Sequence, residues 1–144
     1  MSLMQRGRRI AFDYGEIRIG VAVSDADSIL AAPLVTLKSN DKKLAKQLSK
    51  IFLEIEPLTI YVGKPALLSG QYGSATEKVL TFVEFLRTLV QTPIELIDER
   101  MSTIAAARVL REAGRNAKSS KEYIDMAAAV EILNFALEIE KSKP

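Results

Sequence analysis

Two runs of strand-forming residues, joined by a short corner that contains Gly15, begin this chain. The first run covers residues 8–14 and the second covers residues 17–24. Two such runs this close together predict a β-hairpin. Asp13 lies inside the first run, although aspartate is depleted from strands and a buried carboxylate is costly unless it is paired or binds a metal. The hairpin therefore predicts the start of a sheet. The position of Asp13 within a strand requires a structural or functional explanation.

The rest of the pattern alternates strands with helices. Pro33, inside a third predicted strand at 29–37, favours a sheet edge or a bulge. Ser39–Asp41 can cap the first helix and Pro57 can end it. The later elements are a helix at 42–56, a strand at 58–62, a helix at about 74–90, a strand at 94–98, a helix from Ser102 or Thr103 to Gly114, and a helix from about 119 to 140. The order β-β-β-α-β-α-β-α-α predicts one α/β domain over 1–144, with a mixed five-stranded sheet flanked by helices. Residues 1–3, ahead of a second methionine at Met4, are interpreted as a cloning remnant.

Composition excludes several chemistries. The 144 residues include neither cysteine nor histidine, which removes disulfides, thiolate zinc sites, the Ser-His-Asp triad and imidazole-bound metals. Catalysis must use carboxylates, Lys, Tyr, Ser or Thr, or a hard metal held by oxygen ligands. No apolar segment approaches the ~18 residues of a membrane span, and no signal peptide is visible. We therefore expect a cytoplasmic protein without a membrane partner.

Carboxylates lie within one predicted strand and at the end of another. Asp13 is either a turn aspartate bonded to nearby backbone amides or part of a site. Asp98 and Glu99 are adjacent at the end of the strand 94–98, and the alternative is that both are solvated acids beside Arg100. Neighbouring strand residues face opposite sides of a sheet, so only one of these two acids can share a face with a site. Periodicity alone does not choose between them.

A third carboxylate, Asp125, lies in the predicted C-terminal helix. At ~100° per residue it falls within ~40° of a stripe of apolar residues, namely Ala129, Ile132, Ala136 and Ile139. The polar residues Glu131, Asn134 and Glu138 cluster on the other side of the same helix. Asp125 therefore lies at the start of the helix face that should pack on the sheet. An acid that only caps the helix or faces solvent is not expected on this face.

An acid on a strand, one at the end of another strand and one on a covering helix can meet at one edge of a sheet. Their like charges would raise one another's pKa values unless a divalent cation neutralised them. Mg²⁺ takes oxygen ligands, and two such ions can clamp the attacking and leaving oxygens of a phosphodiester. Three carboxylates in a chain without histidine suit this chemistry, in which they would bind the metal.

Basic residues concentrate between the suspected acids. Residues 100–121 hold six basic side chains and one acid, Glu112, for a net charge of +5, whereas the whole chain carries +2. The six are Arg100, Arg108, Arg111, Arg115, Lys118 and Lys121. This density favours binding of a phosphate backbone, and a solvated helix face with its loop is the alternative. Lys64, in a glycine-containing loop without a P-loop or GxGxxG pattern, and Arg18 are weaker candidates for the same role.

The sequence resembles the YqgF/RuvX family, described as pre-16S rRNA nucleases and as Holliday-junction-resolvase-like proteins. The matching stretches are DYGEIRIGVAVSD at 13–25, GKP at 63–65, DERMST at 98–103 and YIDMAAAVEIL at 123–133. The resemblance implies an RNase H-like fold, a divalent-metal nuclease, and catalytic, metal-binding acids at Asp13, Glu99 and Asp125. It also implies a role in maturing the 5′ end of small-subunit ribosomal RNA. The loop after Pro65, ALLSGQYGS, departs from the commoner asparagine-containing form.

Four functions remain open from the sequence. The first, which we favour, is a nuclease dependent on Mg²⁺ or Mn²⁺ that acts on structured RNA, as a monomer or a homodimer. The second is a resolvase of branched DNA, which needs two sites in a dimer. The third is an RNA-binding factor that keeps the acids without cleaving. The last is a phosphate-binding relative of the actin and sugar-kinase fold, which would need a second lobe that 144 residues do not provide.

Overall fold

The predicted hairpin forms the centre of the sheet. In a computed structural model, which describes residues 4–65, 74–99 and 121–143 and their side chains except at 74–75 and 121–125, β1 (Arg9–Tyr14) pairs antiparallel with β2 (Arg18–Ser24). The corner between them is closed by a hydrogen bond of 2.9 Å from the Gly15 amide to the Arg18 carbonyl. A Cβ at Gly15 would lie 2.7 Å from that carbonyl oxygen, so this corner requires glycine.

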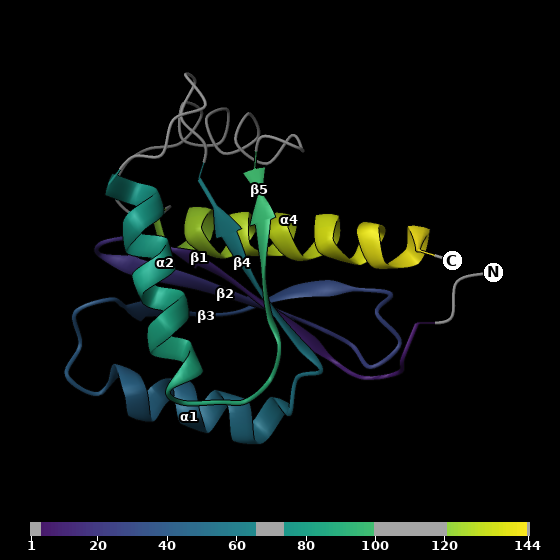
Figure 1. Cartoon of the computed structure of the whole chain (residues 1–144), viewed down its shortest axis with the longest axis horizontal. Helices are drawn as coiled ribbons and strands as arrows, with labels where there is room; N and C mark the ends of the chain where they lie inside the picture. Colours follow the sequence, from purple (N-terminus) through teal and green to yellow (C-terminus); the bar gives the residue numbers. More distant parts are fainter. Residues whose placement is uncertain (1–3, 66–73, 100–120, 144) are drawn as a thin grey trace.

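The sheet has five strands in the order β3-β2-β1-β4-β5 (Figure 1). β3 (Ala31–Lys38) is antiparallel to β2, and β4 (Thr59–Lys64) and β5 (Ile94–Asp98) continue parallel to β1. β3 is an edge strand, and its pairing with β2 shifts beside Pro33, which confirms the edge or bulge expected from that proline. The mixed five-stranded sheet predicted from the sequence is confirmed.

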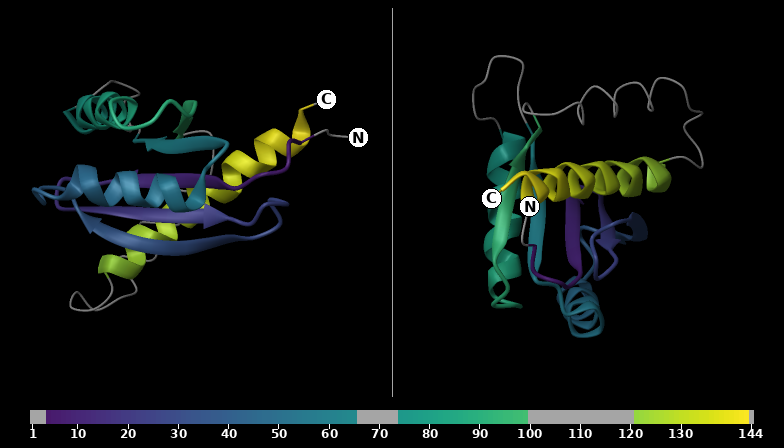
Figure 2. Two further views of the ribbon diagram at one scale, coloured as in Figure 1. Left: turned by 90° about the horizontal axis from the view of Figure 1, so that it is seen from below. Right: turned by 90° about the vertical axis from the view of Figure 1, so that its right-hand side faces the viewer.

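Helices cover both faces of the sheet (Figures 1 and 2). α1 (Leu44–Ile55) and α2 (Ser74–Arg87) lie on one face, and α4 (Lys121–Ser142) crosses the other. The predicted helix that ends at Gly114 lies outside the described residues. α1 begins two residues later than predicted because the Asp41 carboxylate accepts a hydrogen bond from the Lys43 amide and holds a turn before the helix. Among the described residues, no helix is long and apolar enough to cross a bilayer.

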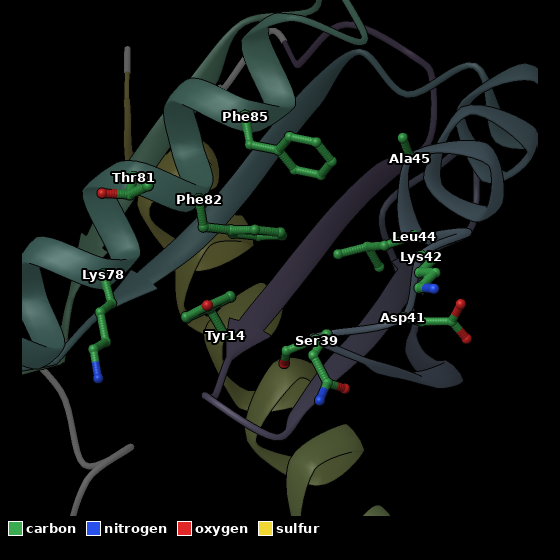
Figure 3. Close-up of a pocket in the computed structure, with 11 residues that line it drawn as sticks. Tyr14, Ser39, Asp41, Lys42, Leu44, Ala45, Lys78, Thr81, Phe82 and Phe85 are labelled. Carbon is green, nitrogen blue, oxygen red and sulfur yellow. The ribbon is translucent and has the colours of Figure 1, made fainter.

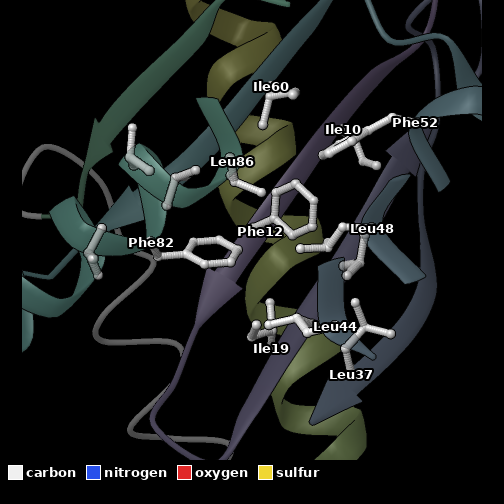
Figure 4. Packing of buried hydrophobic residues seen from close by; sticks show 14 residues of the cluster. Ile10, Phe12, Ile19, Leu37, Leu44, Leu48, Phe52, Ile60, Phe82 and Leu86 are labelled. Carbon is white, nitrogen blue, oxygen red and sulfur yellow. The ribbon is translucent and has the colours of Figure 1, made fainter. Parts of the chain in front are cut away.

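Alternation along β1 assigns its side chains to two cores. Ile10 and Phe12 pack under α1 and α2, where the Phe12 ring meets the rings of Phe52 and Phe82 edge-on at 6.1 and 5.7 Å (Figure 4). Ala11 faces α4. Small residues on both sides of this second core let the helix approach the strands closely: Ala11, Ala22, Ala129 and Ala136, all at most 1% exposed.

A buried ionic contact fixes the C-terminal end of α4 to the start of the sheet. The Arg9 guanidinium, 3% exposed, donates to Glu140 at 3.0 Å, and the Tyr61 hydroxyl donates to the other oxygen of the same carboxylate. Arg9 also donates to Ser28 Oγ at 2.9 Å and to backbone carbonyls. From this contact, α4 crosses the sheet toward the edge formed by the C-terminal ends of β1, β4 and β5.

One part of the stripe predicted for α4 is wrong. Ala129, Ile132 and Ala136 are buried against the sheet as expected, but Ile139 is 37% exposed. Leu133 and Leu137, which the stripe omitted, are buried instead. The buried face is therefore wider than a single stripe and turns away from Ile139 near the end of the helix.

Candidate carboxylate site

Asp13 lies on the face of the sheet that α4 covers. It follows Ala11 by two residues on β1, and Ala11 belongs to the core beneath α4. Asp13 is half-buried, and its direct partner on β2 is Gly20. On the other side of β1, Phe12 pairs with Val62 of β4. The next residue of each strand follows in the same register, so Gly63 lies beside Asp13. Glycines on both neighbouring strands leave space around this carboxylate.

Glu99 lies at the same edge and on the same face. It follows Ile97, whose side chain is 6% exposed in the core beneath α4, and Ile97 pairs with Gly63. The Glu99 residue is only 4% exposed. Of the two adjacent acids that the sequence left open, Glu99 therefore shares a face with Asp13, whereas Asp98 extends from the strand on the other side.

Gly63 separates the two acids and shapes the space between them. A Cβ built on Gly63 would lie 3.1 Å from Glu99 Oε1 and 2.5 Å from Ile132 Cδ1 of α4. The Glu99 carboxylate thus leans over Gly63, toward the strand that carries Asp13. Neighbouring strands are about 4.8 Å apart, so the backbones of Asp13 and Glu99 are roughly 10 Å apart with β4 between them. Any larger residue than glycine would fill the gap through which the two carboxylates approach.

The third predicted acid, Asp125, is on α4 one turn before the fully buried Ala129. Its side chain lies outside the described part of the structure. Among the side chains that are described, no group of three acids gathers as a metal site. Two of the three predicted ligands, Asp13 and Glu99, therefore lie at one edge of the sheet, and the role of Asp125 stays a prediction.

The predicted basic contacts divide between two faces. Arg18 precedes Gly20 by two residues on β2 and lies on the same face as Asp13. Lys64 follows Gly63, pairs in register with Asp98, and lies on the opposite face of the same edge. Arg100, Arg108, Arg111, Arg115 and Lys118 lie outside the described residues, as does the side chain of Lys121.

A second basic region was not singled out from the sequence. Residues 38–50, from the end of β3 through most of α1, carry exposed lysines around a single acid, Asp41: Lys38, Lys42, Lys43, Lys46 and Lys50. The spacing of these lysines was a usable signal, because one acid among five bases resembles the density of residues 100–121. What the spacing did not reveal is that Lys42 lies near the end of β1.

The strand order β3-β2-β1-β4-β5, with helices on both faces, is that of an RNase H-like domain. Solved structures of similar fold agree. A Thermus thermophilus RuvC structure gives a TM-score of 0.56 at 13% identity and covers 95% of this chain and 99% of that one. RuvC of the same species in complex with a Holliday junction substrate gives 0.53 at 12% identity, over 94% and 96%. At this level of identity the likeness concerns the fold.

The sequence itself gives the family. The model of the RuvX family, described as Holliday junction resolvase, matches residues 7–139. The chain belongs to this family, which confirms the resemblance seen in the motifs. A protein of Streptomyces coelicolor named "Putative pre-16S rRNA nuclease" is 44% identical over 140 residues, which are 96% of this chain and 84% of that protein. A protein of the same name from Leifsonia xyli subsp. xyli is 39% identical over 140 residues, or 96% and 90%.

Proposed function

We propose that this protein is a divalent-metal-dependent nuclease that cleaves structured RNA, with the 5′ end of pre-16S rRNA as its substrate. One observation carries the proposal: Asp13 and the buried Glu99 share a face and an edge of the sheet, on either side of Gly63. The names of the relatives at 39–44% identity support the choice of substrate.

The donor set suits Mg²⁺ or Mn²⁺. Every candidate ligand is a carboxylate oxygen, and these hard cations prefer oxygen ligands. Asp13 and Glu99 would hold the cation, with Asp125 of α4 completing the set. When bound, such a cation activates water and neutralises charge that develops on the phosphate. The glycine at position 63 leaves room beside both carboxylates for this purpose.

The remaining residues of the proposed site position the RNA. Arg18, on the same face as Asp13, would contact a phosphate near the cut. Lys64 and the basic side chains of residues 100–121 would hold the backbone further away. Because these contacts are ionic, RNA binding should weaken steeply as salt rises.

The test compares single-acid variants on precursor rRNA fragments with Mg²⁺ or Mn²⁺. Asp13→Asn, Glu99→Gln and Asp125→Asn should each lower the cleavage rate by at least about 100-fold while RNA affinity stays within about threefold. Glu95→Gln is the matched control, since Glu95 is an exposed acid of β5, four residues before Glu99. Full cleavage by Asp13→Asn would refute the assignment.

A resolvase of branched DNA is the second candidate, because the family model carries that description. Cutting a junction symmetrically needs two sites related by a two-fold axis, and hence a dimer. Four-way junctions in the same assay, with light scattering of the protein alone and with the junction, separate the two functions. Cleavage of rRNA fragments by a monomer that leaves junctions intact favours the RNA nuclease.

A further inference from the structure

A cavity of about 540 Å³ opens between α1 and α2, on the opposite face of the sheet from the carboxylate site. Tyr14, at the end of β1, lines it (Figure 3). Because Tyr14 directly follows Asp13, their side chains lie on opposite faces of the same strand end. The cavity is therefore directly behind the carboxylate site. Its volume is within the range of pockets that hold small ligands.

Aromatic rings form one wall of this cavity. Tyr14 stacks on Phe82, with centroids 4.7 Å apart and an angle of 29° between the rings. Phe85, nearly one turn further along α2 and half-buried, points into the space between the helices (Figure 3). Leu44 and Ala45 of α1 form the facing wall. An apolar space between an aromatic wall and an aliphatic wall suits a flat aromatic group such as a nucleobase.

Cationic side chains stand at the rim. Lys42 of the α1 side and Lys78 of α2 lie on opposite sides of the opening (Figure 3). Lys78 makes an ion pair with Glu16 of the β1–β2 corner, but both side chains are largely exposed, so the pair contributes little and is readily exchanged for another anion. The lysine-rich stretch 38–50 adds positive charge on the α1 side. The cavity thus offers a stacking surface for a base and cations for a phosphate.

We propose that this cavity binds an unpaired nucleotide of an RNA strand, with its base against Phe85 and Tyr14 and its phosphate between Lys42 and Lys78. The role of the nucleotide as part of the substrate rests on the proposed function, although its binding does not. An RNA strand that reaches both sites passes over the short corner at 15–17, where Ile17 is 68% exposed. The preferred substrate is then RNA with a single-stranded extension next to the cut.

The test measures binding without cleavage, in the full-length Asp13→Asn protein, by fluorescence anisotropy. The probes are a labelled single-stranded hexaribonucleotide, a blunt RNA duplex and adenosine 5′-monophosphate as a competitor. Phe85→Leu removes the ring but keeps an apolar side chain, and its control is Leu80→Ala, at an exposed position of the same helix. A second variant, Lys42→Gln with Lys78→Gln, changes only exposed side chains and is compared with Lys50→Gln, which lies outside the cavity.

Phe85→Leu should weaken hexanucleotide binding by about 5- to 150-fold, the range of one stacked base, and leave duplex binding within twofold. The double lysine variant should weaken it at least fivefold. Unchanged hexanucleotide binding in both variants, with the thermal midpoint showing that they are folded, would overturn the proposal. Competition by the mononucleotide at the same concentration as the hexanucleotide would also overturn it, in favour of a site for free nucleotides. Should the wild-type protein bind the hexanucleotide here but cleave no RNA, the proposed function fails and this inference stands.

Discussion

Replacing Gly63 by alanine should lower the stability of the fold and displace the Glu99 carboxylate, and the two effects can be measured separately. The new Cβ would lie 2.5 Å from Ile132 Cδ1, closer than carbon atoms can approach, and Ile132 is fully buried. Overpacking of a core typically costs about 1–3 kcal/mol. Alanine also reduces the conformational freedom of the unfolded chain, which offsets about 0.4–1 kcal/mol of this cost. We expect Gly63→Ala to lower the free energy of unfolding by about 1–2 kcal/mol.

A second substitution, Ile132→Val, removes the 2.5 Å clash with Cδ1 but keeps Cγ1, which would lie 3.2 Å from the new Cβ. Ile132→Val deletes Cδ1 and alone should cost about 0.5–1.5 kcal/mol. In the double variant the alanine methyl occupies the vacated space, so the pair should be more stable than the sum of the two single changes by at least about 1 kcal/mol. The 3.1 Å approach of the new Cβ to Glu99 Oε1 persists, so this carboxylate must still shift by a few tenths of an ångström.

The assay pairs urea denaturation with cleavage of precursor rRNA fragments. The double variant should be about as stable as Gly63→Ala or more stable, and yet cleave at least tenfold more slowly than the wild type, because catalysis is sensitive to small displacements of positioned groups. Ile132→Val alone should cleave at the wild-type rate and serves as the control. Wild-type stability of Gly63→Ala would refute the packing argument. Wild-type cleavage by the double variant would refute the role of Glu99.

Three further predictions concern stability. Arg9→Met should lower the free energy of unfolding by roughly 3 kcal/mol in urea denaturation, since it leaves Glu140 without its buried ionic partner; a change below 1 kcal/mol would contradict this. Burial, and next the hydrogen bond to Glu140, raise the pKa of Tyr61 above its ordinary value of 10.0. The folded state therefore retains a proton that the unfolded state loses, so this stabilisation is complete below pH 10 and declines above it. Between pH 10 and 11 wild-type stability should fall by up to about 1.4 kcal/mol more than that of Tyr61→Phe, and parallel curves would exclude the raised pKa. Leu48→Ala, at a fully buried position under α1, should cost about 2–5 kcal/mol while the cleavage rate per folded molecule stays the same (Figure 4).

Local patterns were sufficient for most of the fold. Apolar runs and turn residues predicted all five strands to within a few residues. They could do so because the length of a strand and the alternation of its side chains depend on residues that are consecutive in the sequence. Pro33 correctly indicated the edge, since its missing amide cannot serve a central strand. The choice between Asp98 and Glu99 was different: it depends on which face Ile97 buries, and that is fixed by α4, a segment distant in the sequence.

The cavity behind the site could not be predicted for a similar reason. Its walls come from the end of β1, from the start of α1 and from α2, and each of these is about 25 to 40 residues from the next along the chain. Each contributes residues that resemble ordinary core or surface positions when taken alone. Only the crossing of α1 and α2 over the end of β1 puts aromatic rings and lysines together.

The most direct measurement is a titration of the isotope-labelled protein with Mn²⁺, followed by paramagnetic broadening of backbone amide signals in NMR spectra. The account predicts that broadening centres on Gly20 and Gly63, the neighbours of Asp13 on either side, and that Asp13→Asn abolishes it while Glu95→Gln does not. Broadening centred elsewhere, or unchanged in Asp13→Asn, would show that these carboxylates do not form a cation site.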